Sequence, residues 1–180
     1  MHWLDLMSDR TQKTPIPVLR LARQRDAGEI ARMSREYVEA GLPWTWREAR
    51  VSSHIQAPES TVLVASMEAR LAGFAIMEFG DTVAGLCLLA IHPWCRRKGL
   101  ATRLIQWHER SAITAGIERI HIEVREDNVS ARNLYSALGY QHVKRIPGYY
   151  SGRETAVQVE RELRPMFSGA RVPIWQPGAS

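Results

Sequence analysis

Hydrophobic and polar positions follow two periods along the chain, one typical of strands and the other of helices. Residues 16–22 predict a first strand, and apolar positions three and four residues apart then predict a helix that ends at Gly41. Asp26 and Glu29 have the spacing of a capping box, so we expect the Asp26 side chain to cap this helix.

The middle of the chain is richer in strands. Thr45 and Glu48 repeat the capping pattern and predict a second helix over 46–56. Two β-rich segments at 61–66 and 71–79 predict a hairpin. The next strand, at 83–91, is a continuous apolar run, which is typical of a strand buried on both faces.

The remaining elements alternate between helix and strand. Their expected bounds are a helix at 99–115, a strand at 119–125, a helix from Asp127 or Asn128 to Leu138, and strands at 140–145 and 155–163. The strand, helix and strand in the centre imply a parallel pair with a right-handed crossover, and the outer hairpins imply antiparallel pairing. We therefore predict an α+β fold with a mixed, mostly antiparallel sheet of about seven strands flanked by about four helices.

Length and composition support one globular domain. The chain has 180 residues, of which 45% are hydrophobic and 24% charged. We expect an N-terminal arm at 1–15, a folded domain at 16–164 and an irregular tail at 165–180, which is rich in Pro, Gly and Ser. No apolar run reaches a membrane span of about 20 residues. The first ten residues do not have the pattern of a secretory signal, so we expect a cytoplasmic protein.

The net charge of +5 comes mostly from arginine, which prefers planar anions such as phosphate and carboxylate. Such a charge suits nucleic acid, an anionic cofactor, or simply a solvated basic surface. A nucleic-acid reader needs a longer basic run or interleaved aromatic residues, and the sequence has neither. We therefore expect no direct nucleic-acid binding and no membrane partner.

A possible anion site lies where the apolar strand at 83–91 runs into the next helix. Arg96, Arg97, Lys98 and Gly99 precede that helix, whose first backbone N–H groups have no partners within it. Such N–H groups and the positive end of the helix dipole attract anions, and a glycine lets the backbone approach a phosphate closely. Solvated basic residues at an ordinary helix start are an equally good interpretation.

Two ionisable side chains suggest acid–base chemistry. Glu123 shares one face of the strand at 119–125 with His121 and Arg125, where burial is costly unless the groups pair or line a cavity. Glu123 is thus a candidate general base, although a simple ion pair is the commoner explanation. Tyr135 lies on the core face of its helix and can be either a packed tyrosine or a general acid.

Other residue types give weaker signals. Trp44 and Trp46 near the second helix, and Tyr149 and Tyr150 in the last hairpin, could wall a substrate cleft or pack in the core. The histidines form no HExxH motif, and the His121–Glu123 pair has no PCxxC segment after it. We therefore expect no metal.

Several linked motifs together resemble the GNAT superfamily of acetyl-CoA-dependent N-acetyltransferases. Arg96-Arg97-Lys98-Gly99-Leu100-Ala101 has the form [Q/R]-x-x-G-x-[G/A] at the start of the helix after a buried strand. The likeness is strongest to the branch that acetylates ribosomal-protein alanine, whose motifs are similar to Leu89-Ala90-Ile91-His92-Pro93, to Ile122-Glu123-Val124-Arg125 with Asn128, to the segment 131–140 and to Tyr149-Tyr150.

The resemblance implies a role for each matching residue. Acetyl-CoA would be the acetyl donor, held between the central parallel strands where they splay apart. Its binding residues would be Leu89, Ala90, Ile91, Arg96, Arg97, Lys98, Gly99, Leu100, Ala101, Thr102 and Asn128. Glu123 would be the general base and Tyr135 the general acid.

The resemblance leaves the acceptor open. A protein or peptide N-terminal amine is the first hypothesis, and a small amine such as a polyamine, amino acid or aminoglycoside is the second. The regions that would choose between them, 41–57 and 146–154, match the family least. A non-catalytic acyl-CoA-binding module is a third hypothesis, disfavoured because Glu123 and Tyr135 are both present. Either a monomer or a homodimer is compatible with the sequence.

Overall fold

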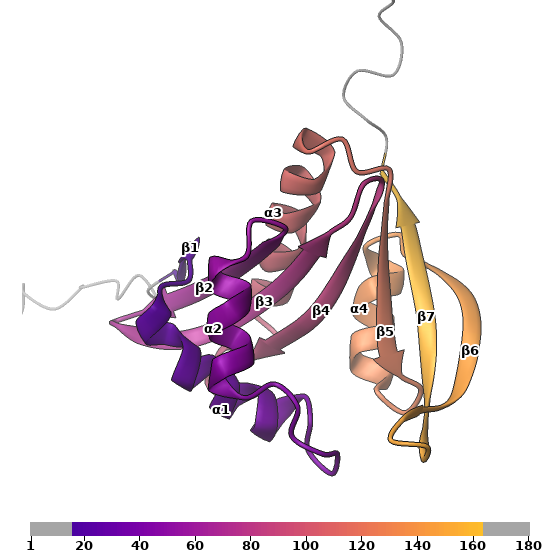
Figure 1. The fold of residues 1–180 in the computed structure, drawn as a ribbon, viewed down its shortest axis with the longest axis horizontal. Coiled ribbons are helices and arrows are strands. Elements are labelled where there is room, and N and C mark those ends of the chain that lie inside the picture. The colour runs from indigo at the N-terminus through magenta and orange to yellow at the C-terminus, as the bar shows by residue number, and fades with distance from the viewer. Residues whose placement is uncertain (1–15, 164–180) are drawn as a thin grey trace, which may run out of the picture.

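The computed structural model describes residues 16–163, which form a twisted sheet with helices on both faces (Figure 1). The expected N-terminal arm at 1–15 and C-terminal tail at 165–180 both lie outside the described residues. Within residues 16–163, no helix is both long and apolar enough to cross a bilayer.

The sheet has seven strands in the order β1-β2-β3-β4-β5-β7-β6. Their bounds are β1 Val18–Leu21, β2 Ser60–Met67, β3 Arg70–Phe79, β4 Val83–Ile91, β5 Arg119–Arg125, β6 Gln141–Tyr150 and β7 Glu154–Glu162. Every neighbouring pair is antiparallel except β4 and β5, which are parallel. The predicted mixed α+β sheet is therefore confirmed.

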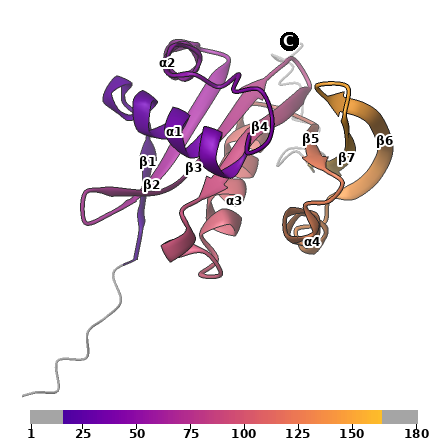
Figure 2. The ribbon, with the colours of Figure 1, turned by 90° about the horizontal axis from the view of Figure 1, so that it is seen from below.

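Four α-helices flank the sheet: α1 Ala27–Tyr37, α2 Glu48–Gln56, α3 Leu100–Thr114 and α4 Val129–Ala137. Figure 2 shows α1 and α2 on one side of the sheet and α3 and α4 on the other. Each side has its own buried cluster, one centred on Phe74 and Ile76 under α1 and α2, the other on Leu104 and Ile120 under α3. Helices cover β2 to β4 on the first side, whereas no helix within residues 16–163 lies over β5 and β7 there (Figure 1).

The parallel pair separates soon after it begins. Only three residues of β4, Val83 to Gly85, pair with β5, and from Leu86 onward β4 has no strand on that side. On its other side β4 stays paired with β3 up to Ile91. Leu86 and Leu88 pair with consecutive residues of β3, which leaves Cys87 as the extra residue of a β-bulge. The sheet is thus opened along two-thirds of β4.

The two predicted capping boxes were wrong, because Asp26 and Thr45 bond to other partners. Helix α1 does begin after Asp26, but the Asp26 carboxylate accepts hydrogen bonds from the Arg20 guanidinium, at 2.7 and 2.9 Å, and from the Arg23 N–H. The Arg20 contact holds the Asp26 pKa below its ordinary value. An ion pair to the preceding strand has replaced the local cap, because arginine is the stronger partner for a carboxylate.

The second helix likewise begins at Glu48 and not at Trp46. Thr45 does not cap it, because both the N–H and the hydroxyl of Thr45 donate to Glu39, at 2.7 and 2.6 Å. The first helix ends at Tyr37, four residues before Gly41. The segment between the two helices is therefore organised around the buried Glu39 carboxylate.

The last strand pair extends further than expected. Strand β6 continues through Pro147 and Gly148 to Tyr150, where the sequence predicted a loop. Its register against β7 shifts between Ile146 and Tyr150, so Pro147 and Gly148 lie in a bulge. Because β6 is an edge strand, proline costs it no ladder hydrogen bond.

A buried polar contact joins the two halves of the opened sheet. The Glu109 carboxylate of α3 accepts hydrogen bonds from the Tyr140 hydroxyl at 3.0 Å and from Arg161 of β7 at 2.7 Å. Both partners belong to the half that contains β5, β6 and β7. This contact therefore links α3 to that half of the sheet.

Candidate active site

A cavity of about 950 Å³ lies where β4 and β5 separate. Its walls come from the α1–α2 segment, β4, β5, the start of α4 and the β6–β7 turn. The carboxylates on its surface are Glu39, Glu59, Glu78 and Glu123. The cavity therefore brings together regions far apart in the sequence, with both candidate acid–base residues on its wall.

Glu123 lies on the face of β5 that no helix covers, and its side chain is 23% exposed. Its Oε1 is 3.8 Å from His121 Nε2, and no other cation of the described residues lies within ion-pair distance of it. Of the two ion pairs that the sequence suggests for Glu123, the one with His121 is present, whereas Arg125 contacts Glu154 at 3.3 Å instead. The Glu123 carboxylate is thus free to accept a proton from a ligand in the cavity.

Tyr135 reaches the cavity from α4 and is buried. Burial raises the pKa of its phenol well above the ordinary value, and neighbouring Tyr150 raises it further. The phenol therefore keeps its proton at neutral pH, as a general acid must. Tyr135 and Glu123 therefore line one cavity, from α4 and β5 respectively.

The proposed donor-binding residues of β4 lie along the separated edge. Leu89 lines the cavity, while the side chains of Ala90 and Ile91 pack into the two clusters on either side of the sheet. These two residues can therefore offer only backbone groups to a ligand. Asn128 lines the cavity as well, and its side chain caps α4 by accepting a hydrogen bond from the Ala131 N–H at 3.1 Å.

The start of α3 presents a run of unused backbone donors. Within residues 16–163, no hydrogen bond uses the N–H groups of residues 97–102, and the next one along, Arg103, bonds back to Gly99. Arg97 and Gly99 both have positive φ values, of 60° and 73°. This alternation curls the turn so that successive N–H groups converge, which is the geometry of an anion-binding nest.

The basic side chains of this turn do not act alike. Arg97 and Lys98 are exposed, whereas Arg96 folds back, donating to the Ile91 carbonyl at 3.0 Å and lying over the Tyr37 ring. Arg96 therefore fixes the turn against the end of β4. None of residues 96–102 lines the cavity, but β4, whose Leu89 does line it, leads toward this turn at its C-terminal end.

Of the four candidate aromatic residues, three line the cavity: Trp46, Tyr149 and Tyr150. Trp44 is not among the lining residues. Its indole N–H donates to the Trp46 carbonyl at 3.1 Å, and its ring lies between the guanidinium groups of Arg35 and Arg47. Trp44 therefore contacts Trp46, which lines the cavity, without lining it itself.

The sequence did not predict the contacts that join the α1–α2 segment to the β6–β7 hairpin on the two sides of the cavity. Arg125 donates to the Ala40 carbonyl at 2.7 Å, and its guanidinium also lies over the Tyr150 ring. The Tyr150 hydroxyl donates to the Glu123 carbonyl at 3.2 Å. Arg125 thus ties the α1–α2 segment to the β6–β7 hairpin across the cavity.

Cys87 lines the cavity at the bulge of β4. Burial and nearby Glu78 raise the pKa of its thiol to about 12. Such a thiol is almost wholly protonated at neutral pH, so it is a poor nucleophile. This environment disfavours a covalent cysteine intermediate.

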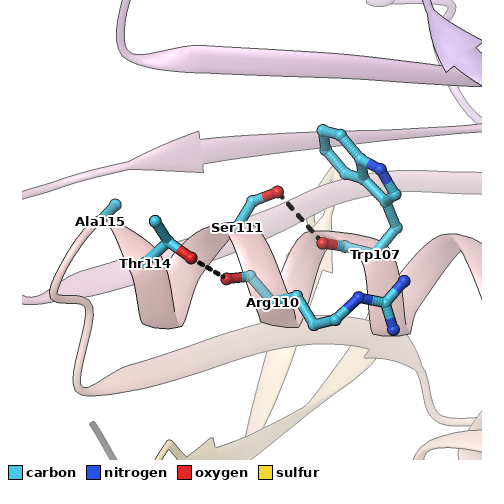
Figure 3. A pocket seen from close by; sticks show the side chains of 5 residues that line it. All are labelled: Trp107, Arg110, Ser111, Thr114 and Ala115. Atoms are coloured by element: carbon cyan, nitrogen blue, oxygen red, sulfur yellow. Dashed lines mark hydrogen bonds between the residues drawn. The ribbon is translucent and has the colours of Figure 1, made fainter. Parts of the chain in front are cut away.

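A second hollow lies along the C-terminal half of α3 and involves Trp107, Arg110, Ser111, Thr114 and Ala115 (Figure 3). The Ser111 and Thr114 hydroxyls donate back to carbonyls of their own helix, at 3.1 and 2.9 Å. The hollow offers no carboxylate or imidazole. It is therefore not a candidate for acid–base chemistry.

Comparison with known proteins identifies a family. Residues 30–140, more than half of the chain, match the model of a family described as Acetyltransferase (GNAT) family. This match includes β4, the turn before α3, Glu123 and Tyr135.

Solved structures show the same fold. The ribosomal-protein-S18-alanine N-acetyltransferase from Escherichia coli matches with a TM-score of 0.69 and 23% identity, over 82% of this chain and 94% of that one. Arabidopsis thaliana NAA60 in complex with acetyl-CoA matches with a TM-score of 0.73 and 14% identity, over 82% and 98%. An aminoglycoside 6'-N-acetyltransferase complexed with coenzyme A matches with a TM-score of 0.69 and 15% identity, over 82% and 98%.

Proposed function

Because the chain belongs to the acetyltransferase (GNAT) family, we propose that it transfers an acetyl group from acetyl-CoA to the N-terminal amine of a protein or peptide. The donor supplies a thioester, whose carbonyl carbon an amine can attack directly. One observation carries the proposal: a single cavity holds a carboxylate, a protonated phenol and an open strand edge, and the strand with that edge leads into a turn of unused N–H groups.

The residues around the cavity fit the donor. The N–H groups of residues 97–102 would bind the diphosphate, together with the exposed Arg97 and Lys98. The backbone of β4 from Leu86 onward has no partner strand on the β5 side, so it can pair with an extended amide-containing arm. Within these segments, the resemblance assigns residues 89–91 and 96–102 to the cofactor, together with Asn128.

Glu123 starts the reaction by making the acceptor nucleophilic. A primary amine is mostly protonated at neutral pH and cannot attack until it loses that proton. The Glu123 carboxylate accepts the proton directly or through one water molecule. Its position on the face of β5 that no helix covers leaves room for the amine beside it.

The backbone and Tyr135 then assist bond cleavage. An N–H group of the segment 89–91 can stabilise the negative charge that develops on the attacked carbonyl oxygen. Tyr135 donates its phenolic proton to the departing sulfur. No covalent enzyme intermediate is needed, since holding both reactants in one cavity supplies much of the acceleration.

The open side of the cavity favours a peptide over a small amine. No helix covers β5 and β7 on the acceptor side, so a chain attached to the amine could continue along the sheet (Figure 1). Tyr149, which is 48% exposed, borders this exit. A small amine remains the second candidate, favoured by the likeness to the aminoglycoside N-acetyltransferase.

A thiol-release assay with acetyl-CoA tests the proposal. The panel pairs short peptides with free N-termini against the same peptides with blocked N-termini, and adds polyamines, single amino acids and aminoglycosides. We expect release of coenzyme A with free peptides and none with the blocked ones. Turnover confined to small amines would refute the peptide acceptor, and no turnover with any amine would refute the transferase assignment.

Acetyl-CoA is also expected to raise the melting temperature. A ligand that binds only the native state at 100 times its Kd adds about 2.7 kcal/mol, which is about 5–10 °C for a domain of this size. Pantetheine, which lacks the nucleotide diphosphate, serves as the matched probe and should give a much smaller shift. Equal shifts for both would rule out the turn before α3 as the diphosphate site.

A further inference from the structure

We propose that His121 receives the proton that Glu123 removes from the acceptor and passes it to solvent. The inference rests on the proposed function, because it presupposes that Glu123 is the base. His121 acts through Glu123, so it is a positioning and relay residue rather than a catalytic one.

The two side chains are arranged for such a transfer. His121 and Glu123 lie two residues apart on β5 and therefore on one face of the strand. Both line the cavity, and His121 Nε2 is 3.8 Å from Glu123 Oε1. This distance is beyond a hydrogen bond, but a modest side-chain rotation or one water molecule can bridge it.

The other carboxylates around His121 already have partners. Glu160 lies opposite His121 on β7, but it accepts a hydrogen bond from Gln158 at 2.7 Å and faces Arg119 at 3.5 Å. Glu78 lies in the same row on β3, where His54 is 3.4 Å from its carboxylate. Of these three carboxylates, Glu123 is the one within ion-pair distance of the His121 ring.

Gly85 allows the imidazole to lie where it does. Gly85 pairs with His121 between β4 and β5, and a Cβ atom at Gly85 would be 3.0 Å from both Cε1 and Nε2 of the ring. Contacts this short would force the ring to move. The absence of a side chain at Gly85 therefore leaves room for the imidazole against β4, beside the cavity.

The chemistry explains why a relay is useful. When the acceptor N–H bond breaks, an O–H bond forms on Glu123, and this proton must leave before the next turnover. The proton moves from Glu123 to Nε2 of His121, and the resulting imidazolium releases a proton to water. Imidazole exchanges protons readily near neutral pH, and the His121 side chain is the more exposed of the pair, at 34% against 23%.

Replacement of His121 by glutamine tests the relay, because glutamine keeps a polar side chain but cannot carry the proton. We expect kcat to fall about tenfold at neutral pH, with the KM of the acceptor changed less than twofold. The acid limb of the pH profile of kcat should move to lower pH, because that limb then reports one carboxylate rather than a coupled pair. His142→Gln, the same change at an exposed position of β6, is the control and should leave the profile unchanged.

The substitution Gly85→Ala supplies an independent test. In the wild-type background, Gly85→Ala should lower kcat as His121→Gln does. In the His121→Gln background, it should lower kcat little further, so the effects of the two substitutions are not additive in a double-mutant cycle. A lowered kcat with an unmoved acid limb would show a merely structural role and overturn the relay. Two further outcomes separate the relay from the proposed function. If Glu123→Gln leaves turnover intact, Glu123 is not the base. If Glu123→Gln lowers turnover but His121→Gln does not, only the relay is refuted.

Thermal unfolding of each variant verifies folding, and His121→Asn replaces His121→Gln if the latter does not fold.

Discussion

Replacement of Glu123 by glutamine is expected to lower kcat by about 10²- to 10⁴-fold, the usual contribution of a general base. Glutamine has nearly the same size and fills the same place on the cavity wall, but its amide cannot accept a proton. The KM of acetyl-CoA should change little, because Glu123 lies on β5 and the proposed diphosphate site lies at the start of α3. Steady-state kinetics with the best acceptor of the panel measure both quantities.

A matched control separates the loss of the base from the loss of a negative charge. Glu162→Gln makes the same change on β7, on the same face of the sheet, where the side chain is 74% exposed. This variant should keep its activity within about twofold, since surface changes of this kind have small effects. Glu123→Gln with wild-type turnover would show that another group, or solvent, deprotonates the amine. A rise in KM alone would assign Glu123 to binding.

The elements found from the sequence are those whose signals are local. The continuous apolar run predicted β4, and the alternation at 119–125 predicted β5, both with the bounds that the structure has. The cap of α4 was also predicted, because Asn128 bonds only three residues along the chain. Glu123 could be proposed for a similar reason, since a carboxylate on a buried central strand is unusual in itself.

The missed features depend on contacts between distant residues. Arg125 and Ala40 are 85 positions apart, and no local sequence pattern predicts their hydrogen bond. The capping boxes failed because stronger partners were close in space: Arg20 for Asp26 and Glu39 for Thr45. The contacts that join the cavity walls therefore could not be predicted from sequence, although several lining residues, such as Glu123, Tyr135 and Tyr149, could.

A buried histidine outside the cavity makes the stability of the fold sensitive to acid. His108 of α3 is fully buried between the helix and the sheet, and neither ring nitrogen has a hydrogen-bond partner within residues 16–163. Burial lowers its pKa to about 4, an effect that the backbone of Ala75 opposes in part. The folded protein therefore holds His108 neutral at a pH where the unfolded chain, with an ordinary histidine pKa of about 6.5, is already protonated.

The sign of the pH dependence follows from this difference. Above about pH 6.5 both states are neutral and His108 costs no stability by titration. As the pH falls from about 6.5 to about 4, only the unfolded state gains a proton, so the free energy of unfolding decreases by about 3 kcal/mol in total. Asp26, whose pKa is lowered by Arg20, contributes a further loss at more acidic pH.

The substitution His108→Leu isolates this contribution. Leucine is apolar and cannot titrate, so the variant should lose about 3 kcal/mol less than the wild type between pH 7 and pH 4, as measured by urea unfolding at both values. The variant should also be at least as stable at pH 7, because it removes two buried nitrogens that lack partners. If leucine does not fit, His108→Gln tests the same titration in a polar side chain. Equal acid sensitivity of wild type and variant would mean that the loss arises from the carboxylates, and that His108 is protonated, or hydrated, in the folded protein.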